Sequence, residues 1–254
     1  MDARSQFGPV AESYLTSASH SNEAELAQFV QWVSPNGGTM LDIATGGGHV
    51  AYAFAPHVTK VLATDITPEM LDIVSREASK RGLANLETRL MSAEDLVLAE
   101  ATMDGVACRL AAHHFVNLPR FLREVYRVLV LGGWFLLVDT CGIDDDHVAD
   151  SGLDAIERLR DPSHVRNQTP NTWRSILGAS GFDIEKFELL AHEYAIKSWM
   201  DRMRVQEPRR SQLCEMMKSS EGALRKYLHP RGEGEDLSFW LHQVAILARK
   251  PLAR

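Results

Sequence analysis

The sequence is poor in cysteine, and its three cysteines, Cys108, Cys141 and Cys214, are widely spaced. An odd and scattered set provides neither a disulfide framework nor the paired spacing of a zinc site, and it is typical of a reducing compartment. The sequence also lacks any run close to the roughly 20 apolar residues of a membrane helix, and no basic run leads into an apolar segment near its start. It contains no internal repeat and no low-complexity tract. We therefore expect a soluble, cytoplasmic globular protein.

Positive charge is in the minority, because 27 Lys and Arg residues face 34 Asp and Glu residues, which leaves a formal net charge of -7. This balance argues against nucleic acid as the main partner. The 254 residues, of which 45% are hydrophobic, suffice for one domain with a substantial core and an added segment.

The most informative stretch runs from Gly38 to Asp65. It predicts a buried strand, a turn of three glycines at 46–48, a helix from about His49 and a second strand that ends at Asp65. Glycines let the chain turn directly from strand to helix and let a ligand approach the backbone, while the helix start offers free N–H groups. A carboxylate at the end of the second strand can accept both hydroxyls of a ribose. The pattern predicts a nucleoside cofactor; a glycine-rich turn without a cofactor is the alternative.

Residues 46–51 also match the dinucleotide pattern G-x-G-x-x-G/A, so a nicotinamide or flavin cofactor stays open on the glycines alone. Asp42, inside the first strand, discriminates between the cofactors. Its carboxylate would repel a pyrophosphate, whereas it would stabilise the ammonium and sulfonium groups of S-adenosylmethionine (SAM). The sequence therefore favours SAM over the NAD(P) of an oxidoreductase.

The segment LDIATGGG resembles the first motif of class I SAM-dependent methyltransferases, in which an acid in a hydrophobic strand precedes G-x-G-x-G. Ala44 stands where the first glycine usually stands, a variant familiar in the ubiquinone/menaquinone C-methyltransferase branch. The resemblance covers about residues 30–190 and extends to small bacterial methyltransferases that share the AAHHF and RLRDPSHVR segments.

The resemblance implies an α/β, Rossmann-like fold: a seven-stranded, mostly parallel sheet with an antiparallel last strand and helices on both faces. A single domain is expected, with N-terminal cofactor-covering helices at 1–33, a core at 34–195, and a last strand and tail at 237–254. The segment 196–236 is rich in methionine and arginine, and it is long for a connection within a compact domain. We expect it to form a helical lid, with a homodimer surface as the rival interpretation.

The resemblance also assigns cofactor contacts. Asp65 is expected to bind the ribose, Asp42 and the glycine loop to face the methionine end, and the turn after the third strand to flank adenine, although Ser92 replaces the usual acid there. Tyr14 is alternatively a packing residue, and Glu94 a solvent-exposed one. The expected cofactor residues are Tyr14, Asp42, Ala44, Thr45, Gly46, Gly48, Asp65, Ile66, Ala93, Glu94, Arg109 and Leu110.

Two adjacent histidines, His113 and His114, follow the fourth strand, at the sheet edge where ligands bind. Histidine can accept a proton at neutral pH, and we expect His114 to be the base and His113 to contact the substrate. Alternatively, one histidine binds backbone and the other caps the next helix. A metal site is not expected, since no third ligand has a recognisable spacing and the acids at 144–146 are interpreted as a solvated loop.

A second polar segment at 160–166 contains Arg160, His164 and Arg166, which could bind an anionic substrate group. Alternatively, Arg160 and Asp161 only stabilise this loop. Together these features predict methyl transfer from SAM to a small organic acceptor through oxygen, nitrogen or carbon. A SAM-binding protein that does not methylate would share the same cofactor loop and remains the alternative.

Overall fold

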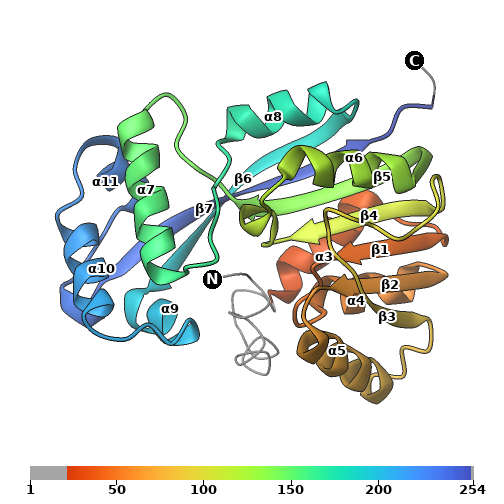
Figure 1. Cartoon of the computed structure of the whole chain (residues 1–254), viewed down its shortest axis with the longest axis horizontal. Helices are drawn as coiled ribbons and strands as arrows, with labels where there is room; N and C mark the ends of the chain where they lie inside the picture. The colour runs from red at the N-terminus through yellow and green to blue at the C-terminus, as the bar shows by residue number, and fades with distance from the viewer. Residues whose placement is uncertain (1–21, 253–254) are drawn as a thin grey trace.

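The structure, a computed structural model, describes residues 22–252 and is organised around one sheet (Figure 1). The strand order is β3-β2-β1-β4-β5-β7-β6. Strands β1 to β5 pair in parallel, and β7 runs antiparallel to both of its neighbours, β5 and β6. The predicted sheet is therefore confirmed. The strands are β1 (Thr39–Ile43), β2 (Lys60–Asp65), β3 (Leu86–Leu90), β4 (Met103–Arg109), β5 (Leu129–Thr140), β6 (Asp183–Ala195) and β7 (Ser238–Arg249).

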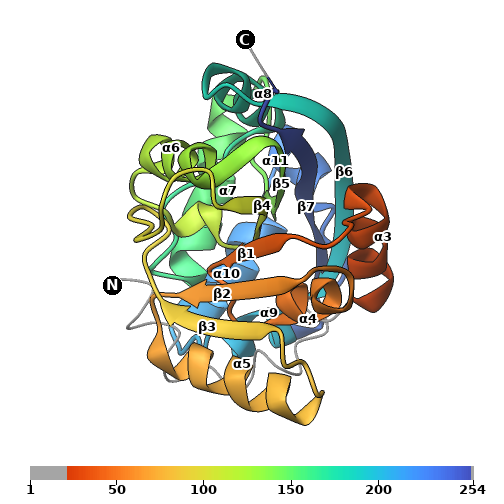
Figure 2. The same cartoon turned by 90° about the vertical axis from the view of Figure 1, so that its right-hand side faces the viewer.

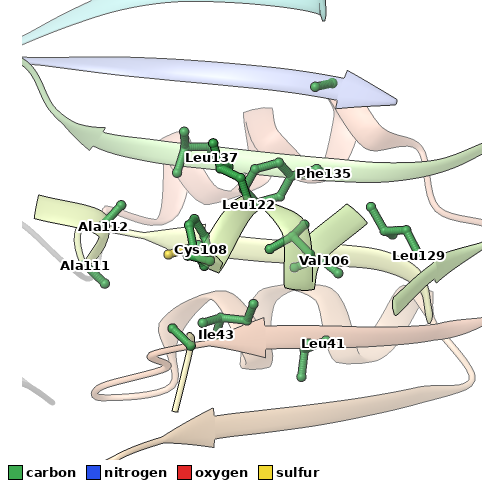
Figure 3. Close-up of a cluster of buried hydrophobic side chains, with 14 of the residues drawn as sticks. Leu41, Ile43, Val106, Cys108, Ala111, Ala112, Leu122, Leu129, Phe135 and Leu137 are labelled. Atoms are coloured by element: carbon green, nitrogen blue, oxygen red, sulfur yellow. The ribbon is translucent and has the colours of Figure 1, made fainter. Parts of the chain in front are cut away.

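Helices cover both faces of the sheet (Figure 2). On one face lie α3 (Glu23–Val33), α4 (His49–Phe54) and α5 (Pro68–Lys80), and on the other α6 (Leu118–Val128) and α8 (Pro170–Ala179). Each face buries its own apolar cluster, with Phe29 and Phe54 in the first and Phe121 and Trp173 in the second. Figure 3 shows part of the second cluster, in which Leu122 of α6 lies against the sheet beside Phe135 and Leu137 of β5.

Gly105 shows how the sequence sets the packing of the central strands. A Cβ atom at this position would lie 1.9 Å from the Trp134 ring, which crosses β4 from the neighbouring β5. Trp134 in turn stacks on Phe54 of α4 with ring centroids 5.5 Å apart. The missing side chain at 105 is thus what allows the largest residue of β5 to lie against the adjacent strand.

Helix α7 (His147–Arg160) begins directly after the acids at 144–146. Its N-cap is Asp146, whose carboxylate accepts a hydrogen bond of 2.9 Å from the Ala149 N–H group. The Asp144 carboxylate accepts the Asn171 N–H group in the first turn of α8 at 3.2 Å. The acids at 144–146 therefore lie on a loop that is at least partly exposed, as expected, and two of them also satisfy helix starts.

The connection between β6 and β7 is helical, as predicted, and consists of α9 (Ile196–Arg202), α10 (Arg209–Lys218), α11 (Gly222–Leu228) and a single 3-10 turn (Gly234–Asp236). These helices gather with α7 beyond one end of the sheet (Figure 1) and bury a third apolar cluster. Met200 and Met217 are fully buried in it, so the methionines of this insertion form a core with α7. None of the helices in residues 22–252 is long and apolar enough to cross a membrane.

Candidate active site

A cavity of about 380 Å³ lies at the carboxyl ends of the parallel strands. One part of its wall comes from the loops after β1 to β4, including Gly46, Asp65, Ala93 and Leu110. The other part comes from α7, the segment after it, and α9, which contributes Trp199, with Met203 directly after that helix. The insertion therefore forms a wall of the cavity, on the side away from the glycine loop.

The glycine loop turns through left-handed backbone conformations. Gly46 has a φ of 52°, and a Cβ atom there would have no neighbour within 4 Å, because the loop borders the cavity. Gly48 has a φ of 81°, and a Cβ atom there would lie 2.5 Å from the Tyr52 ring. Ala44 also has a positive φ, of 53°. This conformation costs an L-residue about 1–2 kcal/mol, which explains why glycine is usual at this position.

Asp65 occupies the predicted place at the end of β2. Its carboxylate accepts the Gly46 N–H group at 3.0 Å and the Thr67 N–H group at 2.9 Å. Burial raises the pKa of Asp65, although these backbone donors act in the opposite direction. Ile66, 38% exposed, lies beside it in the cavity wall. The site thus combines a fixed acceptor with an uncovered apolar surface, as a nucleoside requires.

Asp42, by contrast, lies behind the cavity wall, with only 1% of its surface exposed. Its carboxylate accepts the Thr45 hydroxyl at 2.6 Å, so these two residues support the loop from below. Burial, the largest effect, raises the pKa of Asp42 to about 7. Gly48 is likewise absent from the wall of the cavity.

Arg109 also lies outside the cavity wall, in a buried ion pair of 2.7 Å with Glu25 of α3. Glu25 lies 3.3 Å from His192 of β6, so the group connects α3 to two strands. The structure therefore gives Arg109 a role in the attachment of α3.

The turn after β3, which was expected to flank adenine, lies in the cavity wall. Ala93 and Glu94 line the cavity, and a Glu94 carboxylate oxygen accepts the Asn117 N–H group at 2.9 Å. Ser92, which replaces the usual acid, accepts the Glu94 N–H group at 3.2 Å. Leu110 completes this side of the wall. Tyr14 lies outside the described residues.

The His113 side chain forms a pair with Asp139, at the end of β5. Its ring nitrogen Nδ1 lies 2.6 Å from one carboxylate oxygen, and its backbone N–H group donates to the other at 2.8 Å. Burial lowers the pKa of His113, but the charge and hydrogen bond of Asp139, together with the charges of Glu157 and Asp161, outweigh this effect, so that the pKa is raised above 6.5. The His113 carbonyl accepts the Val165 N–H group at 2.9 Å, which fixes the residue from a third direction.

His114 has a different environment, although both histidines line the cavity. Its Nδ1 atom lies 3.1 Å from the Ser163 carbonyl oxygen, and its Nε2 atom is 3.9 Å from Asp161. Burial and the neighbouring His113 lower the pKa of His114 well below 6.5. Sequence reasoning favoured His114 as the base, but Asp139 is the partner of His113. Both His113 and Asp139 could be read from the sequence, but their pairing across 26 residues could not.

Of the three polar residues expected at 160–166, only Arg160 lies in the cavity wall. His164 is buried, 3.0 Å from Asp154 of α7. Arg166 forms ion pairs with Asp150 and, at 2.8 Å, with Asp154. His164 and Arg166 therefore attach the segment after α7 to that helix. No group of three or more His, Cys, Asp or Glu residues that could hold a metal ion occurs within residues 22–252.

Comparisons with known proteins agree with this architecture. The Methyltransferase domain family matches residues 41–137. The chain is 34% identical over 212 residues to "Uncharacterized methyltransferase YcgJ" of Bacillus subtilis (strain 168), covering 82% of both chains. The crystal structure of YcgJ superimposes with a TM-score of 0.84 at 30% identity, over 91% of this chain and 99% of that one.

A shorter match connects the chain to a second group of enzymes. The chain is 30% identical over 112 residues to the ubiquinone/menaquinone biosynthesis C-methyltransferase UbiE of Zymomonas mobilis. This match covers 44% of this chain and 46% of that one. The match to YcgJ extends over most of both proteins, and the sheet, the glycine loop and the acid at the end of β2 are those of the fold. The chain therefore belongs to the class I SAM-dependent methyltransferases, with relatives in the UbiE group.

Proposed function

We propose that the protein transfers a methyl group from SAM to a small organic acceptor. The observation that carries this proposal is the shared cavity, in which a nucleoside-type end at Asp65 and Ile66 continues into a polar end at His113 and Arg160. The acceptor end of the cavity is bounded by α7 and α9. This enclosure supports a small molecule, rather than a polymer, as the methyl acceptor. The excess of acidic residues supports the same choice.

The residues of the cavity fit the family's cofactor. The open space above Gly46 and the exposed face of Ile66 leave room along the loop, and Asp65 lies where a ribose can donate to it. Ala93 and Glu94 would flank the adenine, and the buried charge of Asp42 would act on the methionine end through the loop. SAM, when bound, supplies a methyl group that is electrophilic because it is attached to a sulfonium.

His113 is the proton acceptor in this proposal, in place of His114. The bond between Nδ1 and Asp139 orients the ring and stabilises its protonated form, which leaves Nε2 to accept a proton from the nucleophile of the acceptor. His114, whose pKa is depressed, serves as a neutral hydrogen-bonding wall beside it. The remaining contribution of the protein is alignment of the two reactants and exclusion of water, worth roughly 7–11 kcal/mol in favourable cases.

Calorimetric titration with SAM, S-adenosylhomocysteine and NADH tests the cofactor assignment. We expect both sulfur nucleosides to bind and NADH not to bind; binding of NADH alone would refute the proposal. The second step measures formation of S-adenosylhomocysteine with a panel of small acceptors. A protein that binds SAM but never forms this product with any acceptor would be a SAM-binding module instead.

Single-residue variants then test the proton acceptor. His113→Ala should slow turnover by about 10²–10⁴-fold and leave SAM affinity nearly unchanged, because the ring is remote from the nucleoside end. His114→Ala is the matched control, since it removes the neighbouring imidazole. Equal losses in both variants would contradict the assignment to His113.

A further inference from the structure

Helix α7 carries four acids along one side: Asp150, Asp154, Glu157 and, directly after the helix, Asp161. Spacings of four, three and four residues place them in one row. All four are less than a tenth exposed. Buried carboxylates are unfavourable unless they are paired, so each of them requires partners.

Three of the four acids each accept at least one hydrogen bond. Asp150 accepts the Ile143 N–H group at 2.9 Å and pairs with Arg166. Asp154 contacts His164 at 3.0 Å and Arg166 at 2.8 Å. Asp161 accepts the backbone N–H group and the hydroxyl of Ser163, at 2.8 Å and 2.6 Å. These three carboxylates stabilise the loop after α7.

Glu157 differs from the other three. Its Oε1 atom is buried and has no hydrogen-bond partner within residues 22–252, and its Oε2 atom lies 4.0 Å from a terminal nitrogen of Arg160. Among the three acids within α7, Glu157 is the one whose side chain lines the cavity. A buried, unsatisfied acceptor costs about 1–3 kcal/mol, and more when it is charged. Its position in the cavity wall suggests that a ligand satisfies it.

Arg160 lies one turn further along α7, in the same wall, with 13% of its side chain exposed. Its Nε atom donates to the Trp199 carbonyl at 3.0 Å, and its guanidinium covers the Trp199 ring at 4.5 Å. These contacts fix the group. Its two terminal nitrogens donate no hydrogen bond to any residue that the structure describes, and the single ion pair to Glu157 is long.

Glu157 and Arg160 therefore present an unsatisfied acceptor and unsatisfied donors side by side. A ligand that meets both must carry a hydrogen-bond donor next to an anion, since the facing atoms are 4.0 Å apart. Around them, Trp199, Met203 and Leu241 supply an apolar surface. We propose that this pair recognises the acceptor, which is a small carboxylic acid with a hydroxyl or amino group beside the carboxylate and an apolar remainder.

In this arrangement the donor group of the acceptor binds Glu157, and its carboxylate binds Arg160 as a charge-assisted pair. The inference rests on the proposed function, because it concerns the acceptor end of the same cavity. It adds the chemical class of the acceptor, which the methyltransferase fold alone leaves open.

Calorimetry with three matched probes tests the subsite: phenyllactate, its methyl ester and phenylpropanoate. The ester lacks the anion, and phenylpropanoate lacks the hydroxyl. We expect phenyllactate to bind at least about tenfold more tightly than either, the scale of one charge-assisted hydrogen bond. Glu157→Met should remove the preference for the hydroxyl and Arg160→Met the preference for the acid, while Arg123→Met, at an exposed position of α6, should change neither.

Thermal unfolding separates recognition from a structural role. Glu157→Met should leave the unfolding midpoint unchanged or raise it, because it removes an unsatisfied carboxylate. Asp154→Asn, on the same helix, should lower the midpoint because its oxygens are engaged. A fall in the Glu157→Met midpoint as large as that of Asp154→Asn would overturn the inference.

The probe titrations are run with and without S-adenosylhomocysteine, whose own binding is measured separately. If S-adenosylhomocysteine does not bind to the protein, the result counts against the proposed function. Equal affinity for the three probes, or no affinity for any of them, would overturn the subsite even if the cofactor binds.

Discussion

The buried charge of Asp42 should make the stability of this protein fall as pH rises. Its side chain lies under the cofactor loop with 1% of its surface exposed, and burial raises its pKa from 3.8 to about 7. A carboxyl whose pKa is raised by folding stabilises the folded state fully below its unfolded pKa. That contribution is lost as pH rises toward the folded pKa.

The size of the effect follows from the two pKa values. The full difference of about three pKa units corresponds to about 4 kcal/mol, since one unit is worth about 1.4 kcal/mol. Between about pH 5 and about pH 8, the wild type should lose roughly 2.5 kcal/mol relative to a variant that cannot ionise at this position. For a chain of this size, that is roughly 5–10 °C in the unfolding midpoint.

Asp42→Asn is the appropriate variant, because its side-chain oxygen can still accept the Thr45 hydroxyl. Urea unfolding of both proteins at several pH values gives the difference in unfolding free energy, which should grow in favour of the variant from acid to alkaline pH. Asp72→Asn, at an exposed position of α5, serves as the control and should show no such trend. A difference between Asp42→Asn and wild type that is constant with pH would refute the reasoning. The same variant should bind SAM more weakly, since the charge near the methionine end is lost.

Three further predictions concern the site and the core. Asp65→Ala should weaken S-adenosylhomocysteine binding by about 1.5–3 kcal/mol in calorimetry, and unchanged affinity in a folded variant would remove Asp65 from the site. Asp139→Asn should lower the pKa of His113, which Asp139 raises above 6.5, so the rise of turnover with pH should move to lower pH with a smaller maximum; an unmoved profile would contradict the pair. Gly105→Ala should destabilise the fold by about 1–3 kcal/mol or more because of the Trp134 ring, whereas Gly178→Ala, with nothing within 4 Å of the new Cβ, should stabilise α8 by roughly 0.5–1 kcal/mol; chemical denaturation measures both.

The sequence was sufficient for the cofactor loop and the two strands around it because their signals are local, whereas the complete sheet was expected from the family resemblance. Apolar residues predominate in β1 and β2, which precede and follow the glycine loop. The turn at Gly46 and the acid at Asp65 follow from the geometry of a strand followed directly by a helix.

The polar half of the site was less predictable, because its pairs are distant in the chain. The sequence shows His113 and Asp139 as separate residues, and only the parallel pairing of β4 and β5 places them together. The same holds for Arg166, which looked available for a substrate but is engaged by Asp150 and Asp154 of α7. The choice between such partners depends on side-chain packing, which no local pattern encodes.

The two ends of the cavity come from different parts of the chain. The nucleoside end is formed by residues 44–94, whereas the wall around Arg160 and Trp199 is formed by residues 157–165, 194–203 and 241. Because α7 and the β6–β7 insertion share a core of their own, exchange of these elements between homologues would leave the glycine loop and its supporting strands intact. Sequence changes in the second half of the chain can therefore alter which acceptor the fold takes. The first half, which forms the nucleoside end, can stay the same and continue to bind the methyl donor.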